Sequence, residues 1–132
     1  MRVALDTNVL VSAIGTRGLC ADVVRIVLRD HDLIAGEQVL TELRRNLTKK
    51  LRLASDVAAE YDGFLRRQAA ATPDAEPIRL AKVDPADAQV LGDAVAGDAE
   101  LLVTGDRALL TLGARAPLVL LNPRQFWEQV HR

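Results

Sequence analysis

The chain has 132 residues, of which 49% are hydrophobic and 27% are charged. This composition is typical of a globular protein and argues against disorder, and the length suits one domain with a single core rather than two. A formal net charge of −1 gives the chain no overall attraction to nucleic acid, so binding of that kind would depend on local charge.

The first half of the chain alternates short apolar runs with segments of helical spacing. Between residues 37 and 51, apolar side chains recur at steps of one, three and four, which is typical of a helix with one buried face. The expected strands are Arg2 to Leu5 and Leu33 to Ala35. The expected helices are Val9 to Ile14, Ala21 to Arg29, Glu37 to about Leu51, and Ser55 to about Ala71.

The second half begins with a link that Pro73 and Pro77 punctuate, and then continues the alternation. Asp84 and Pro85 predict a helix start, with Asp84 as the N-cap and proline at the first helical position. The expected strands are Ile78 to Leu80, Leu101 to Thr104 and Leu118 to Leu121, and the expected helices are Pro85 to about Ala96, Arg107 to Leu112 and Pro123 to Val130. Strands that alternate with helices predict an α/β fold in which helices cover both faces of a parallel sheet.

The single cysteine and the hydropathy pattern bear on the compartment. Cys20 alone excludes an internal disulfide and a cysteine-rich zinc site. The first residues reach the charged Asp6 before the apolar core of a signal peptide could form, and no stretch approaches the roughly 20 apolar residues that span a bilayer. We therefore expect a cytoplasmic protein with no membrane contact.

Four acidic residues stand where carboxylates from separate segments of such a sheet would converge. Asp6 and Asp106 follow apolar runs, Glu42 lies on the long helix, and Asp87 lies in the first turn of a later helix. Ligands of open parallel sheets bind where the strands end, and the first strand commonly neighbours a strand from the second half of the chain. Each acid also has an ordinary alternative role, as a helix cap, a partner of the helix dipole or an exposed helical residue.

Carboxylates at close range repel each other, and a divalent cation is the usual remedy. Hard cations such as Mg²⁺ prefer oxygen ligands, and the lack of His and Cys among the four candidates disfavours zinc. Mg²⁺ or Mn²⁺ suits phosphodiester hydrolysis, because it lowers the pKa of bound water and neutralises charge on the phosphoryl oxygens. The four acids therefore predict a phosphodiester hydrolase with one or two metal ions.

Four motifs resemble the landmarks of a known family. They are V-A-L-D-T-N-V-L-V-S-A, the Glu42 helix, D-A-Q-V-L-G-D-A and L-L-V-T-G-D. Over nearly the whole chain they resemble the PIN-domain ribonucleases, in particular the small single-domain toxins of the VapC type. The resemblance implies a metal-dependent endoribonuclease with a three-layer α/β/α sandwich and a central parallel sheet of four to five strands, formed as one domain by residues 1–132.

The resemblance also implies roles for single residues. The catalytic and metal-binding pocket would consist of the four acids, and Asn8 and Thr104 would orient it as polar neighbours. A helix cap for Asn8 and a strand-edge hydroxyl for Thr104 stay open as alternatives, and Asp84 fits a cap better than a ligand. Many relatives carry a further acid two places after the T-G-D aspartate, where this chain has Ala108, so a second tightly bound ion is not implied.

Charge is distributed unevenly along the chain. Residues 42–67 contain seven basic and four acidic residues, a net charge of +3. Residues 74–106 contain two basic and eight acidic residues (net −6), and residues 107–132 contain four basic residues and one acidic residue (net +3). On the long helix, Arg45 and Lys49 follow Glu42 by three and seven residues and share its face. We expect them to bind RNA phosphates without reading bases. A solvated cationic face is the alternative, above all for Lys50 and Arg52.

Two other functions stay open at this point. An aspartyl-phosphate phosphatase would use Asp6 as nucleophile and Asp106 as metal ligand, but it wants an acid two residues after the nucleophile, where this chain has Asn8. A non-catalytic RNA-binding module that keeps the fold is the other. For the ribonuclease, the expected partners are RNA, a cognate antitoxin, and a second copy of the chain that pairs through residues 37–71.

Overall fold

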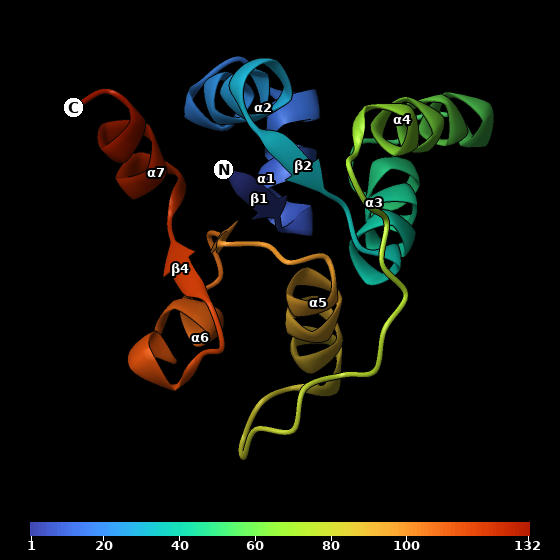
Figure 1. The fold of residues 1–132 in the computed structure, drawn as a ribbon. Coiled ribbons are helices and arrows are strands. Elements are labelled where there is room, and N and C mark those ends of the chain that lie inside the picture. Colours follow the sequence, from blue (N-terminus) through green and yellow to red (C-terminus); the bar gives the residue numbers. More distant parts are fainter.

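The structure, a computed structural model that describes all 132 residues, is built around a four-stranded parallel sheet (Figure 1). Its strands are β1 (Arg2–Leu5), β2 (Asp32–Ile34), β3 (Leu101–Val103) and β4 (Val119–Leu121). Their order across the sheet is β2-β1-β3-β4, so β1 pairs with β2 on one side and with β3 on the other. The first strand of the chain is therefore central.

Helices connect the strands and cover the sheet. In chain order they are α1 (Thr7–Gly15), α2 (Leu19–Asp30), α3 (Glu37–Lys49), α4 (Ser55–Gln68), α5 (Pro85–Ala96), α6 (Arg107–Leu110), the 3-10 turn η1 (Gly113–Arg115) and α7 (Pro123–Val130). Figure 1 shows α2 and α5 on opposite sides of the strands, and α2 packs against α7. The expected α/β fold, with helices on both faces of a parallel sheet, is confirmed.

The predicted strand at Ile78 to Leu80 is wrong. These residues have no regular structure, and the backbone N–H of Ile78 donates to the carbonyl of Ala88 on α5 (3.1 Å) instead of joining the sheet. Gly92 allows this close approach, because a Cβ at that position would collide with the carbonyl oxygen of Glu76. The segment is thus held against a helix, and short apolar runs cannot signal that choice by themselves.

The helix predicted to reach about Ala71 ends at Gln68, because the residues that follow pair with the edge of the sheet. Ala70 donates its N–H to the carbonyl of Leu33 (2.8 Å), and Ala35 donates to the carbonyl of Ala71 (3.0 Å). The result is a single parallel bridge between Ile34 of β2 and Ala71 rather than a fifth strand. The other boundaries differ from expectation by a few residues at most.

The core is a cluster of 26 buried hydrophobic residues that the sheet and the inner faces of the helices share. The apolar stripe predicted on α3 is part of it, since Val39, Leu40, Leu43 and Leu47 are all buried. Burying one leucine side chain contributes about 2 kcal/mol. None of the helices is long and apolar enough to cross a bilayer.

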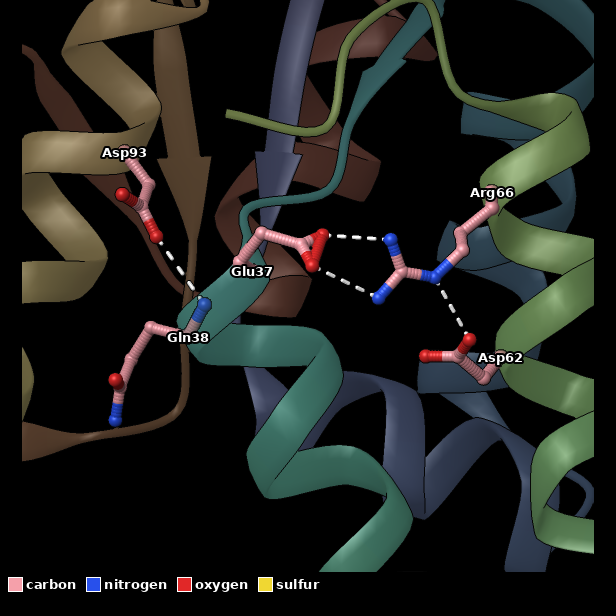
Figure 2. Close-up of polar contacts among 5 residues, drawn as sticks. All are labelled: Glu37, Gln38, Asp62, Arg66 and Asp93. Atoms are coloured by element: carbon pink, nitrogen blue, oxygen red, sulfur yellow. Dashed lines mark hydrogen bonds and ion pairs between the residues drawn. The ribbon is translucent and has the colours of Figure 1, made fainter. Parts of the chain in front are cut away.

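Two sets of polar contacts, each made by acidic side chains, hold the start of α3 in place (Figure 2). The guanidinium of Arg66 on α4 donates to both carboxylate oxygens of Glu37 (2.6 and 2.9 Å) and to Asp62 (2.7 Å). From the other side, Asp93 on α5 accepts the backbone N–H of Gln38 (3.2 Å). The first turn of α3 is thereby tied to both α4 and α5.

Asp93 is almost fully buried and serves three donors at once. Besides Gln38, it accepts the N–H of Ala75 (2.9 Å) and the side-chain amide of Gln89 (2.9 Å). A buried carboxylate is tolerated only when hydrogen bonds replace its hydration. Asp93 therefore links the 72–77 segment, α3 and α5 in one polar junction.

We expect Asp93→Ala to lower the free energy of unfolding by about 3 kcal/mol, because it leaves several buried donors without an acceptor. Urea unfolding of the purified protein measures this change. Asp74→Ala, which removes an exposed acid from the neighbouring segment, is the control and should change stability by about 0.5 kcal/mol or less. A loss below about 1 kcal/mol for Asp93→Ala would contradict the role of the junction.

Candidate functional site

The pairing of β1 with β3 brings two of the predicted acids to one edge of the sheet. Leu5 lies opposite Val103, and the ladder continues one step further, because the N–H of Asp6 donates to the carbonyl of Val103 (2.9 Å). Asp106 follows β3 by three residues. Both acids therefore leave the carboxyl ends of adjacent parallel strands, where ligands of such sheets bind.

All four predicted acids line one pocket of about 330 Å³. Asp6 comes from the end of β1, Glu42 from α3, Asp87 from the first turn of α5, and Asp106 from the start of α6. The rest of the lining consists of Thr7, Asn8, Val11, Ser12, Asn46 and Lys50. Four segments that are far apart in the sequence thus deliver one carboxylate each.

Asp6 is the most buried of the four acids and the most firmly held. One carboxylate oxygen accepts the N–H of Thr7 (2.8 Å), and the other accepts the hydroxyl of Thr104 (2.6 Å) and the side-chain amide of Asn8 (3.4 Å). The Asn8 carbonyl oxygen in turn accepts the N–H of Gly105 (3.1 Å). Asn8 and Thr104, which the sequence singled out, therefore both contact Asp6 and tie it to the T-G-D loop.

Glu42 has a donor for each carboxylate oxygen. Oε1 accepts the side-chain amide of Gln38 (2.7 Å), one turn earlier on α3, and Oε2 accepts the hydroxyl of Thr7 (3.2 Å). Neither Gln38 nor Thr7 was expected from the sequence to belong to the site. The spacing of four between Gln38 and Glu42 was a usable signal, since residues at that spacing share a helix face.

Asp106 and Asp87 are half-buried and complete the acidic lining of the pocket. Asp106 caps α6, with its carboxylate accepting the N–H of Ala108 (2.8 Å), and its own N–H donates to the Thr104 hydroxyl (3.0 Å). Asp84 caps α5 by accepting the N–H of Ala86 (2.9 Å), as the sequence indicated. For Asp106, the roles of helix cap and pocket acid coexist.

The electrostatics of the pocket are those of uncompensated negative charge. Burial raises the pKa of Asp6, and the charges of Glu42 and Asp106 raise it further, against the hydrogen bonds from Thr104 and Thr7. Partial burial, followed by the charges of the other acids, raises the pKa of Asp87 to about 6. None of the four carboxylates forms an ion pair with a Lys, Arg or His side chain.

The donor chemistry fits a hard divalent cation. No three His, Cys, Asp or Glu side chains are already arranged to hold one metal ion. Mg²⁺, however, usually takes only one or two protein carboxylates and completes its shell with waters and substrate phosphates. Four carboxylates that line one pocket and form no ion pair meet that requirement, and the absence of histidine and cysteine from the lining does not suit zinc.

The two basic residues expected to bind RNA phosphates lie outside the pocket. Arg45 and Lys49 are exposed on α3 but do not line it, whereas Asn46 and Lys50 do. The reason is the helical angle: Asn46 and Lys50 follow Glu42 by one and two turns on the side that faces α1, which packs against α3. Sequence spacing shows that these residues lie on the same face of α3 as Glu42, but it does not show which of them lie beside a neighbouring helix.

A second hollow, of about 350 Å³, lies between α1, α2 and α4. Nine of its ten lining residues are hydrophobic, and Arg25 is the exception. Tyr61 and Phe64 on α4 belong to its lining and are about 40% exposed (36% and 42%). We call this hollow the apolar groove.

Comparison with known proteins gives a family and a fold. The PIN domain model matches residues 2–108. Similar solved structures include VapBC2 from Rickettsia felis bound to a promoter DNA fragment (20% identity, TM-score 0.64, 92% of this chain and 98% of that one) and VapBC-1 from nontypeable Haemophilus influenzae (13%, 0.63, 94% and 99%). FitAcB from Neisseria gonorrhoeae is also similar (19%, 0.58, 92% and 98%). Among curated proteins, none matches the sequence.

We expect Asp87→Asn to raise the melting temperature at pH 7.5 in EDTA by about 3 °C, because it removes a charge that partial burial and the neighbouring acids both disfavour. A carboxylate whose folded pKa is raised destabilises the folded state above that pKa, about 6, and has no such effect below the unfolded value of 3.8. The gain should therefore disappear by about pH 4. Thermal melts of both proteins between these pH values measure it.

Asp74→Asn, an exposed acid outside the pocket, is the matched control for this measurement and should show no such pH dependence. A lower melting temperature for Asp87→Asn at pH 7.5 would contradict the repulsion among the four acids.

Proposed function

Because the chain belongs to the PIN-domain family, we propose that it is a metal-dependent endoribonuclease that hydrolyses RNA phosphodiester bonds. PIN domains are nucleases, and the finer assignment rests on one observation about this chain. Four carboxylates from four segments line a single pocket, and no cationic side chain pairs with any of them. A site of this kind suits a reaction in which a cation and a phosphate supply the missing charge.

In this proposal, Asp6, Glu42, Asp87 and Asp106 hold Mg²⁺ or Mn²⁺. When bound, the cation lowers the pKa of water and neutralises charge on the phosphoryl oxygens. Thr104 and Asn8 orient Asp6 through the hydrogen bonds described above, and Gln38 and Thr7 orient Glu42. Donors of this kind fix ligand geometry before the substrate arrives.

Two alternative functions have less support. A phosphatase with Asp6 as nucleophile needs a proton donor two residues later, and Asn8 at that position is already engaged with Asp6 and Gly105. A non-catalytic RNA-binding module has no use for four uncompensated acids, whose repulsion opposes both folding and the approach of phosphate. The cleavage assay described below separates the module from the nuclease.

We also propose that the protein is the toxin of a toxin–antitoxin pair. The sequence motifs resemble the VapC-type toxins, and the solved structures of VapBC2 and FitAcB have the same fold as this chain. The apolar groove offers such a partner a hydrophobic surface, since exposed Tyr61 and Phe64 are large side chains that gain from burial. Outside the pocket, we propose that Arg45 and Lys49 hold further RNA phosphates.

We expect Asp6→Asn and Asp106→Asn to reduce RNA cleavage in Mg²⁺ or Mn²⁺ by more than about 100-fold. Loss of residues that only orient metal ligands typically costs about 10- to 100-fold, so loss of a ligand should exceed that range. Thr104→Val should fall within it. Cleavage of a labelled oligoribonucleotide by the purified proteins measures all three.

Asp98→Asn, which changes an exposed acid before β3, is the control and should cleave at the wild-type rate. Mn²⁺ should raise the melting temperature of the wild type by mass action, EDTA should reverse the rise, and Asp6→Asn should lose most of it. Wild-type cleavage by Asp6→Asn, or no cleavage by the wild type in either metal, would contradict the proposed reaction.

We expect the isolated chain to form a homodimer, with the exposed apolar side chains of α4 contributing to contacts within residues 37–71. Light scattering at tens of micromolar measures the mass of the wild type and of Phe64→Ser. If the wild type is a dimer and Phe64→Ser is a monomer, the dimer contact includes α4. If both proteins are dimers, the contact does not depend on Phe64, and the apolar groove is available to an antitoxin. A monomeric wild type would contradict the homodimer.

A further inference from the structure

The acidic pocket has a second wall that carries no acid. Ser12 comes from the second turn of α1, and Asn46 and Lys50 come from the end of α3. Each of these side chains is a hydrogen-bond donor, and Lys50 is the only cationic residue in the lining. The pocket is therefore acidic at one end and rich in donors at the other.

The residues that α3 contributes to the pocket lie on successive turns of the helix. Glu42, Asn46 and Lys50 follow one another at intervals of four along α3, with Lys50 as the C-cap, and thus lie on successive turns. The rise over these eight residues is roughly 12 Å at about 1.5 Å per residue. Lys50 accordingly stands well apart from the carboxylate of Glu42, although both line the same pocket.

The donors of this wall are not used by the protein itself. The side chains of Ser12, Asn46 and Lys50 make no hydrogen bond to any other residue, and Lys50 is in no ion pair despite the acids nearby. By contrast, the donors around Asp6 and Glu42 are all engaged. Unused donors with one positive charge suit a ligand with acceptor oxygens and a negative charge.

We propose that Ser12, Asn46 and Lys50 form a subsite for the RNA phosphate adjacent to the one that is cleaved, an inference that rests on the proposed ribonuclease function. In this arrangement the acids act on one phosphate at their end of the pocket. Ser12, Asn46 and Lys50 bind the next phosphate along the RNA strand. Such contacts position the backbone and carry no sequence information. The subsite also offsets the repulsion that the acids exert on an approaching strand.

The test measures RNA binding in the cleavage-deficient Asp6→Asn background, by fluorescence anisotropy with two labelled oligoribonucleotides of unrelated sequence in EDTA. Lys50→Gln should weaken binding of both about five- to tenfold, as expected for one charge-assisted hydrogen bond reduced by the exposure of Lys50 to solvent. The slope of log affinity against log salt should become shallower by about 0.7, because one fewer counterion is released. Lys50→Arg should keep the slope.

Arg44→Gln is the matched control, since it removes the same charge from an exposed position of α3 outside the pocket. It should change affinity by no more than about twofold, because exposed charges away from the ligand are screened. Asn46→Leu, which removes a donor without changing charge, should weaken binding and keep the salt slope. If Lys50→Gln matches Arg44→Gln in affinity and slope, the subsite is overturned.

Steady-state cleavage by the otherwise wild-type chain separates this proposal from the ribonuclease assignment. Lys50→Gln should raise KM about five- to tenfold with little change in kcat, since the contact is the same in ground and transition states. If the chain cleaves RNA and Lys50→Gln leaves KM unchanged, the subsite fails and the nuclease stands. If the chain cleaves no RNA, the nuclease fails and the subsite for a neighbouring phosphate fails with it, even where Lys50→Gln weakens binding; only a contact between Lys50 and RNA then remains.

Discussion

The cost of burying acidic side chains around one small pocket, to which repulsion among the four carboxylates adds, is the constraint to which the surrounding structure responds. Asp6 is buried and its pKa is raised, so its ionised form is held at a cost to folding. Thr104 and Thr7 reduce that cost through hydrogen bonds, and Gln38 does the same for Glu42. The free energy that sustains this arrangement comes from the 26-residue apolar core behind it. A stable scaffold and an unfavourable pocket are thus parts of one design, which is common at functional sites.

Helix α3 contributes to both the core and the pocket, because its two sides carry different side chains. One side contributes the buried stripe of Val39, Leu40, Leu43 and Leu47. Another presents Gln38, Glu42, Asn46 and Lys50 in a line, with the last three along the pocket. Its first turn is clamped by Arg66 through Glu37 and by Asp93 through the N–H of Gln38 (Figure 2). Rigid support at the start of a helix sets the position of side chains several turns later.

Much of the fold could be predicted from the sequence, because its signals are local. Asp84, Pro85 and Gly97 bound α5, and Pro123 starts α7, so both helices have the expected ends. The acids of the pocket were also accessible, since Asp6 and Asp106 follow buried strands whose order has few alternatives. Contacts between distant segments were not accessible. The course of Ile78 to Leu80 depends on the space above Gly92, and the placement of Lys50 rather than Lys49 at the pocket depends on where α1 lies.

The pairing of β1 with β3 also has a consequence for the order of folding. The bond from Thr104 to Asp6 spans 98 positions, and the β1–β3 ladder spans a similar stretch. During synthesis the first strand and its helices emerge long before β3, and they can pair with β2 but cannot complete the pocket. Contacts of such long range form slowly, because loop closure must precede them. A nascent chain therefore lacks the complete pocket until its last quarter has left the ribosome, and a chain truncated before Thr104 lacks both Asp106 and the hydroxyl that holds Asp6.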